Sequence, residues 1–204
     1  MNRFDSAART WDNNPMHQQR SEAIASKMKE QIDLNRTMTA LEFGAGTGIL
    51  SFLLKDSLKE IVMMDNASEM VNVMEEKIRS VHAGNMKPIC FNLVESDGFD
   101  QSFDLIYNQM VLHHIDDVPS ILSKFFRILN PGGHLVIADL YPEDGSFHGE
   151  GFTGHNGFDT EELCNQLRDL GFKNPKQEPC FVVKKPVDGN VVKEFPVFIL
   201  TATK

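Results

Sequence analysis

A strand-like run that leads directly into a glycine-rich turn restricts the possible folds of this chain more than any other segment. Thr39–Phe43 is short and mostly apolar, and Gly44-Ala45-Gly46-Thr47-Gly48 follows it without a break. A helical stretch, Ile49–Lys55, begins at the next residue. Glycines in such a turn allow backbone dihedrals that are closed to other residues, and the first turn of the helix offers free N–H groups. The segment therefore predicts a strand, a ligand-binding turn and a helix.

The alternation of strand and helix patterns continues along the chain. Strands are predicted over Glu60–Met64, Lys87–Phe91, Phe103–Tyr107 and His134–Asp139. The apolar spacing predicts helices over Ser21–Leu34, Ser68–Val81 and Val118–Leu129, with Ser68 as an N-cap and Asn130–Gly133 as the turn that ends the third of them. This order is typical of a parallel sheet with crossover helices.

The pattern changes after the predicted fifth strand. Tyr141–Phe158 is rich in glycine and predicts a long loop, of the kind that is often functional. A helix is predicted over Thr160–Leu170, with Thr160 as its N-cap. Two final strands, about Lys176–Lys184 and Glu194–Thr203, flank the turn signal Asp188-Gly189-Asn190. A hairpin with no helix between its strands adds an antiparallel edge to the sheet.

Length and charge limit the organisation and the partners of the chain. The 204 residues predict one domain, residues 1–204, with an N-terminal helical lid or cap over 1–36 and an α/β core over 37–204. The net charge of −9 makes nucleic acid an unfavourable partner, because affinity for nucleic acid depends on lysine and arginine neutralising phosphates. The first residues are polar and no stretch reaches the length of a membrane span, so we expect a cytoplasmic protein without a membrane partner.

An acidic residue and the glycine spacing narrow the type of ligand. Ligands of open α/β sheets bind at the carboxyl ends of the strands. Asp65 follows the predicted second strand, where a carboxylate can accept hydrogen bonds from both hydroxyls of a ribose. Ile49 occupies the position of the third glycine in the GxGxxG pattern of dinucleotide sites. The pattern therefore counts against a nicotinamide dinucleotide.

Four motifs in order resemble those of the class I S-adenosylmethionine-dependent methyltransferases of the small-molecule type. Leu41–Gly48 is similar to the family's first motif and Asp65–Met70 to its second. Ser102–Asn108 with Val111–Ile115 resembles the segment that closes over the cofactor, and Leu129–Leu135 resembles the turn before the fifth strand. The resemblance implies a Rossmann-like, doubly wound α/β fold with a mostly parallel seven-stranded sheet and an antiparallel C-terminal hairpin strand. It also implies S-adenosyl-L-methionine as the cofactor and S-adenosyl-L-homocysteine as the product.

The resemblance assigns one group of residues to the methionine part of the cofactor. Glu42 is expected to contact its amino group, directly or through water. Asn108 is expected to give a backbone contact nearby. The residues of the glycine-rich turn are expected to cradle the methionine chain: Gly44, Ala45, Gly46 and Gly48.

A second group is assigned to the adenosine. Asp65 is expected to bind the ribose, and Asn66 and Met70 to border the adenine. The family often has an acidic residue after the third strand that meets the adenine amino group, whereas this chain has Asn92 followed by Leu93. The side-chain oxygen of Asn92 can still accept that hydrogen bond.

Histidines are the candidates for proton transfer on the acceptor side. Methyl transfer from a sulfonium requires alignment and exclusion of water, and a general base only if the acceptor must lose a proton. His113, His148 and His155 are the predicted catalytic residues. The alternatives are that His113 or its neighbour His114 packs beneath the cofactor or binds main chain, and that the two loop histidines are solvated. No metal is predicted, because the spacing between His148 and His155 matches no recognised ligand pattern.

The segment before the first strand has two interpretations. Phe4 and Trp11 belong either to an amphipathic segment packed on the sheet or to a lid over the cofactor, with Trp11 among the cofactor-binding residues. Arg20 could reach a carboxylate, although a solvated helix arginine is the simpler interpretation.

The predicted function is methyl transfer to an oxygen or nitrogen atom of a small-molecule acceptor, by a monomer or homodimer. Asn108-Gln109-Met110-Val111 differs from the Asn/Asp-Pro-Pro-Tyr/Phe pattern of enzymes that methylate amino groups of adenine or glutamine. Three alternatives stay open: a non-catalytic regulatory protein that binds S-adenosylmethionine, a nicotinamide-dependent oxidoreductase, and a protein or RNA methyltransferase.

Overall fold

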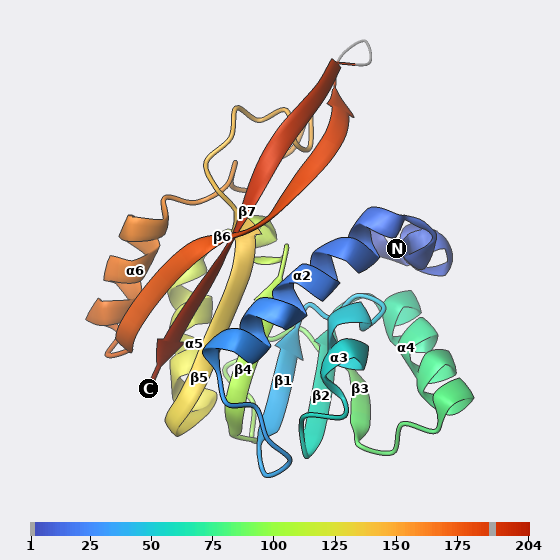
Figure 1. Cartoon of the computed structure of the whole chain (residues 1–204), viewed down its shortest axis with the longest axis vertical. Coiled ribbons are helices and arrows are strands. Elements are labelled where there is room, and N and C mark those ends of the chain that lie inside the picture. The colour runs from blue at the N-terminus through green and yellow to red at the C-terminus, as the bar shows by residue number, and fades with distance from the viewer. Residues whose placement is uncertain (1–2, 188–190) are drawn as a thin grey trace.

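A single mixed sheet forms the centre of the molecule. The computed structural model describes residues 3–187 and 191–204, and within them seven strands pair in the order β3-β2-β1-β4-β5-β7-β6 (Figure 1). The first five strands along the chain are parallel. They are β1 (Thr39–Phe43), β2 (Glu60–Asp65), β3 (Met86–Cys90), β4 (Phe103–Gln109) and β5 (Leu129–Leu140). The predicted α/β class with a mostly parallel sheet is confirmed.

Helices cover both faces of the sheet, so the fold is doubly wound. The side chains of β4 alternate between the faces, as the pleat of a strand requires: Leu105 and Tyr107 belong to one buried cluster and Ile106 to the other. The helices α2 (Pro15–Gln31), α3 (Ile49–Leu54) and α4 (Ser68–Val81) contribute to the first cluster. The helices α5 (Val118–Ile128) and α6 (Thr160–Asp169) contribute to the second. None of the helices among the described residues is long and apolar enough to cross a membrane.

Helix starts differ from the prediction because other side chains satisfy the first N–H groups. The N-cap of α4 is Ala67, not Ser68, and the main-chain N–H of Glu69 donates to Asp5 Oδ1 at 3.1 Å. Asp5 belongs to α1 (Arg3–Ala7), which the 3₁₀ helix η1 (Ala8–Asn13) follows. At the start of α6, the Asp159 carboxylate accepts hydrogen bonds from the main-chain N–H groups of Glu161 and Glu162. Asp159, not Thr160, is therefore the N-cap.

The starts of α2 and β5 also differ from the prediction. Helix α2 begins at Pro15, with Asn14 as the N-cap that accepts from Met16 N at 3.1 Å, and so includes a turn that precedes the periodic apolar pattern. The predicted turn Asn130–Gly133 is instead the beginning of β5. Leu129 pairs with Phe103 there, and the register shifts before the regular pairing of the two strands begins.

The C-terminal hairpin is confirmed, and it extends beyond the sheet. β6 (Lys173–Val187) and β7 (Val191–Thr203) are antiparallel, with β7 inserted between β5 and β6; the predicted turn at Asp188–Asn190 lies outside the described residues. Pairing of β5 with β7 ends at Leu140 and Val197. Residues 182–187 and 191–196 therefore pair only with each other and project past the carboxyl end of β5 (Figure 1).

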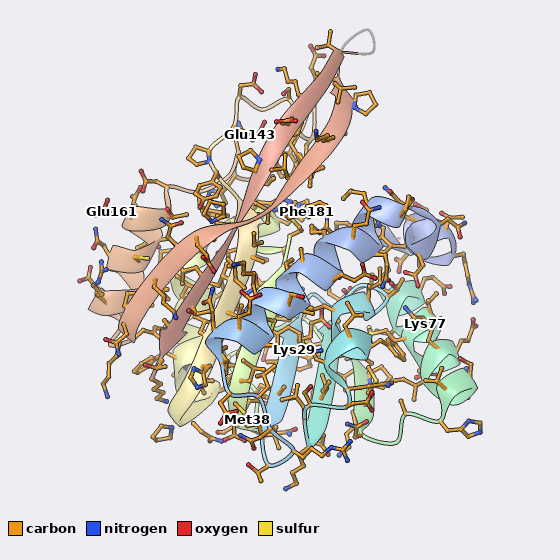
Figure 2. The ribbon with its side chains drawn as sticks, in the orientation of Figure 1. Lys29, Met38, Lys77, Glu143, Glu161 and Phe181 are labelled. Carbon is orange, nitrogen blue, oxygen red and sulfur yellow. The ribbon has the colours of Figure 1, made fainter. Side chains whose placement is uncertain are left out.

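The glycine-rich segment after β5 lies beside this projecting hairpin. Residues 141–158 contain no helix or strand, as predicted. Lys193 Nζ lies 2.7 Å from Asp144 Oδ2, and Lys185 Nζ donates to the Phe147 carbonyl. Figure 2 labels Glu143 in this segment, next to the hairpin. The segment and the hairpin therefore form one continuous extension at the ligand-binding edge of the sheet.

Candidate active site

A cavity of about 760 Å³ lies at the carboxyl ends of the parallel strands. Its size is typical of sites for small molecules, which range over about 300–1,000 Å³. Eight of the predicted cofactor-binding residues line it: Trp11, Gly44, Gly46, Asp65, Asn66, Met70, Asn92 and Leu93. Other lining residues lie on α2, on η2 (Leu112–His114) and just before it, in the segment after β5 and in the projecting hairpin. They include Arg20, Met110, His113, His114, Phe147, His148, Val183 and Lys185. The cavity thus joins the predicted cofactor site to a region lined by this second set of residues, which we call the second compartment.

Asp65 holds the glycine turn in place at the first end of the cavity. Its Oδ2 accepts from Gly46 N at 2.7 Å and its Oδ1 from Ala67 N at 2.8 Å. Burial raises the pKa of this carboxyl group, and these backbone hydrogen bonds oppose the rise. A carboxylate offers about four lone-pair positions, so acceptor capacity remains for a ribose hydroxyl. Close by, Asn92 Oδ1 accepts from Val94 N at 3.1 Å.

Glu42 lies behind the glycine turn and not in the lining of the cavity. The side chain is completely buried, and its Oε2 accepts from the hydroxyl of Ser51 and from Ser51 N at 3.2 Å. The same Ser51 hydroxyl lies 2.6 Å from the hydroxyl of Tyr107. Among the described residues, Oε1 has no hydrogen-bond partner. Burial raises the pKa of Glu42 to about 8, although the hydrogen bonds from Ser51 act against it. Its predicted contact with the cofactor, direct or through water, stays a prediction.

The raised pKa of Glu42 predicts a pH dependence of stability. The folded protein keeps a proton on Glu42 that the unfolded chain releases above a pKa of about 4.5. This stabilisation is complete below that value and is lost as the pH rises to about 8, by at most about 1.4 kcal/mol per pH unit. Glu42→Gln removes the titrating group. We expect urea unfolding between pH 5 and 9 to show a steeper decline in the native protein than in Glu42→Gln; parallel curves would contradict the assignment.

Three further predicted cofactor residues lie outside the lining. Ala45 N donates to the Met64 carbonyl at 2.9 Å, which ties the turn to β2. Gly48 is the N-cap of α3 with a φ of 79°, and a Cβ there would lie 3.1 Å from Met63 Sδ. Asn108 is completely buried, and its side-chain amide has no hydrogen-bond partner among the described residues. Their predicted contacts with the cofactor stay predictions.

The N-terminal segment is fixed over the glycine turn. Thr47 Oγ1 donates to Asp12 Oδ1 at 2.5 Å, and Lys77 of α4 lies 2.8 Å from Asp12 Oδ2. Trp11 lines the cavity, stacks on His17 with ring centroids 4.3 Å apart, and accepts a hydrogen bond from His17 Nδ1 at its carbonyl. Packing and cavity lining therefore coincide in this segment, and its closure over the cofactor stays a prediction.

The four histidines do not share one environment. His113 is buried, and its Nδ1 lies 2.6 Å from Asp139 Oδ1 while its main-chain N–H donates to Asp139 Oδ2 at 3.2 Å. His114 and His148 line the cavity beside it. His155 does not line the cavity; its Nε2 donates to the Ile115 carbonyl at 3.0 Å, and its N–H donates to the His113 carbonyl at 2.9 Å. This placement supports an anchoring role for His155 rather than the predicted catalytic one.

Arg20 is the important residue that the sequence interpretation placed wrongly. It is 6% exposed and lines the cavity, so it is not a solvated helix arginine. A signal was present, because Arg20, Ile24 and Met28 follow an i, i+4 spacing and share one face of α2. The hairpin residues Val183 and Lys185 were also missed, since the alternation along β6 does not reveal that this part of the strand extends past the sheet.

Comparisons with known proteins agree with this site. A family model for a methyltransferase domain matches residues 16–177. An uncharacterized methyltransferase of Schizosaccharomyces pombe is 30% identical over 67% of the chain and 54% of its own length. A malonyl-[acyl-carrier protein] O-methyltransferase of Laribacter hongkongensis is 25% identical over 84% of the chain and 63% of its own length. The chain therefore spans roughly half to two thirds of these curated relatives.

The fold also recurs among solved structures. A phosphoethanolamine N-methyltransferase of Haemonchus contortus, solved with S-adenosyl-L-methionine, superposes with a TM-score of 0.69 at 15% identity, over 90% of this chain and 52% of that one. A likeness at this identity concerns the fold. The sequence match over most of the chain, the doubly wound sheet and the glycine turn beside Asp65 agree in their conclusion. The chain belongs to the class I methyltransferase family, whose cofactor is S-adenosyl-L-methionine.

Proposed function

We propose that this protein transfers the methyl group of S-adenosylmethionine to an oxygen or nitrogen atom of a small acceptor that carries a negatively charged group. The observation that carries the proposal is the buried guanidinium of Arg20, in the same cavity as the cofactor residues. The names of the relatives do not decide between the two acceptor atoms, since one is an O-methyltransferase and another an N-methyltransferase.

The guanidinium of Arg20 has donors to spare. A guanidinium carries five N–H donors. Among the described residues, Arg20 makes one side-chain hydrogen bond, from Nη1 to Met16 Sδ at 3.6 Å, and its Nε has no partner. Burial lowers the pKa of Arg20 to about 10, opposed by the negative charge of Asp139, so the group stays positively charged at neutral pH. A buried cation with free donors favours a carboxylate or phosphate ligand, which can bind in a bidentate manner.

Asp139 does not use up this capacity. Its carboxylate oxygens already accept from His113 Nδ1, His113 N and Leu140 N, at 2.6, 3.2 and 2.8 Å. Asp139 therefore offsets part of the charge of Arg20 without a hydrogen bond to it in the described structure. The ammonium of Lys185, which donates to the Phe147 carbonyl, adds a second positive charge to the lining.

The shape of the cavity supports a small acceptor. Methyl transfer is an in-line displacement, so the acceptor must be held next to the methyl group and away from water. The N-terminal segment, residues 141–158 and the hairpin all contribute residues to the lining of the cavity. His113 and His148 line it and stay candidates for accepting a proton from the acceptor, whereas His155 is turned toward main chain. The net charge of −9 favours a small molecule over RNA.

Labelled S-adenosylmethionine and a fractionated metabolite pool test the proposal. We expect label in acidic small-molecule fractions. We further expect Arg20→Met to raise KM for that acceptor by about a hundredfold, the equivalent of one bidentate charge-assisted contact. The affinity of Arg20→Met for S-adenosylhomocysteine should match that of the native protein. Arg79→Met, which removes an exposed arginine from α4, is the matched control.

Each other outcome has a distinct meaning. Label in protein or RNA would replace the small acceptor by a macromolecule. Cofactor binding without methyl transfer to any fraction would indicate the regulatory alternative. Transfer to neutral acceptors with unchanged kinetics in Arg20→Met would remove the anionic group from the proposal.

A further inference from the structure

We propose that His113, His114 and His148 form a binding site for a divalent metal ion of the zinc type in the second compartment of the cavity. The first two side chains come from η2 and the third from the segment after β5. Each offers one imidazole nitrogen, and these nitrogen atoms all lie within 4.8 Å of one another. Three imidazoles with an open fourth position are a ligand set that zinc occupies in enzymes.

The environment of His113 is that of a metal ligand. Its Nδ1 lies 2.6 Å from Asp139 Oδ1. An ionised carboxylate only accepts hydrogen bonds, so the proton of neutral His113 is on Nδ1 and the lone pair is on Nε2. Histidines that bind metals commonly donate their other ring N–H to a carboxylate, which fixes the ring and increases its basicity. Asp139 is completely buried, so this arrangement is shielded from water.

The site needs only small movements to close around an ion. Zn–N bonds of about 2.0–2.1 Å in a tetrahedral site place the nitrogens about 3.3 Å apart. The nitrogens here lie within 4.8 Å of one another, so each pair must approach by at most about 1.5 Å to reach this spacing. His155 fastens the segment that carries His148 to η2, through hydrogen bonds to the carbonyls of His113 at 2.9 Å and Ile115 at 3.0 Å. His155 is therefore a positioning residue for the cluster.

The ion would keep one coordination position toward the cavity. All three histidines line it, as does Arg20. Water or an anionic oxygen atom can occupy the fourth position. If the proposed function holds, that oxygen belongs to the negatively charged group of the acceptor, held between the metal and the guanidinium. Metal binding itself requires no acceptor, and it would occupy the ring nitrogens of His113 and His148 that could otherwise accept a proton.

Packing of the rings is the alternative explanation for the cluster. The ring centroid of His113 lies 4.1 Å from that of His114 and 5.0 Å from that of His148. The ring of His148 stacks on Phe152 with centroids 3.9 Å apart. Such contacts hold aromatic rings together without an ion. The two explanations differ in whether the chain binds a metal.

Calorimetric titration of the chelator-treated full chain with Zn²⁺ tests the site. We expect one ion per chain, and with Co²⁺ as the probe the strong visible absorption of a tetrahedral complex. Removal of one of three protein ligands, in His114→Ala or His148→Ala, should weaken binding by about a hundredfold or more. Asp139→Asn should weaken it about 10–100-fold.

Two histidines outside the cluster serve as controls. His82 is exposed after α4 and reports adventitious binding at the surface, and His17 lines the cavity on the face of Trp11. His82→Ala and His17→Ala should bind Zn²⁺ as the native protein does. Circular dichroism and thermal melts confirm that each variant is folded.

Two results would overturn the proposal: native protein without a one-to-one Zn²⁺ complex, or folded His114→Ala and His148→Ala variants with native affinity. S-adenosylhomocysteine binding, measured in parallel, separates this proposal from the previous one. Retained cofactor binding and methyl transfer without metal binding reject the metal site alone. Metal binding without methyl transfer rejects the proposed function alone.

Discussion

Replacement of Asp65 by alanine should reduce the affinity for S-adenosylhomocysteine by about a hundredfold or more. Each charge-assisted hydrogen bond from a ribose hydroxyl contributes about 1.5–3 kcal/mol. The same carboxylate accepts from Gly46 N at 2.7 Å and Ala67 N at 2.8 Å. Its removal therefore also loosens the turn on which the cofactor lies. Calorimetry of both proteins measures the effect.

Two variants separate the parts of this effect. Asp65→Asn keeps one side-chain acceptor and should fall between the native protein and Asp65→Ala. Asp56→Ala removes an exposed carboxylate that pairs with Lys55 outside the cavity, and should bind the cofactor normally. Native affinity in a folded Asp65→Ala would show that the ribose is bound by other residues.

Alanine at Gly44 and alanine at Gly46 should affect different properties of the protein. Both have positive φ, 68° at Gly44 and 57° at Gly46, which costs an alanine about 1–2 kcal/mol. A Cβ at Gly44 would lie 2.5 and 2.7 Å from the methyl groups of Val111, and such overpacking costs about 1–3 kcal/mol more. A Cβ at Gly46 would have Trp11 Nε1, 4.0 Å away, as its nearest neighbour. We expect Gly44→Ala to lose stability and Gly46→Ala to lose cofactor affinity.

Urea unfolding and calorimetry distinguish these outcomes. Gly46→Ala should lose only the backbone cost of about 1–2 kcal/mol in stability. It should bind S-adenosylhomocysteine at least tenfold more weakly, because its methyl group occupies the cavity; this corresponds to about 1.4 kcal/mol. Val111→Ala in the Gly44→Ala background should restore the part of the stability that overpacking removed. No recovery in this double variant would mean that the backbone conformation alone causes the loss.

The predicted cofactor end of the cavity could be located from the sequence because its residues are close together in the chain. Strand β1, the turn and α3 are contiguous, and Asp65 is the last residue of the neighbouring strand β2. The hydrophobic periods and the glycines therefore indicate the geometry of this region before any tertiary contact is known. The fold class could be predicted for the same reason, since helices separate the parallel strands along the chain everywhere except between β3 and β4.

The second compartment could not be predicted from the sequence, because contacts between residues far apart in the chain create it. His113 and His148 are far apart in the chain and meet only when the segment after β5 returns to η2. Spacing along the sequence argues against His148 and His155 as a pair of metal ligands, whereas the structure brings His148 to His113 and His114. Arg20 was misread because its charge suggested exposure, although its position relative to Ile24 indicated burial.

Residues of the projecting hairpin can change without altering the strand pairing that positions the glycine turn and Asp65. Beyond Leu140 its strands pair only with each other, so exchanges at the cavity-lining positions Val183 and Lys185 leave the pairing of the central sheet unchanged. The glycine turn and Asp65 lie on strands that do not contact this extension through pairing. If the proposed acceptor side is correct, a library randomised only in the hairpin is expected to change the acceptor and leave the affinity for S-adenosylhomocysteine unchanged.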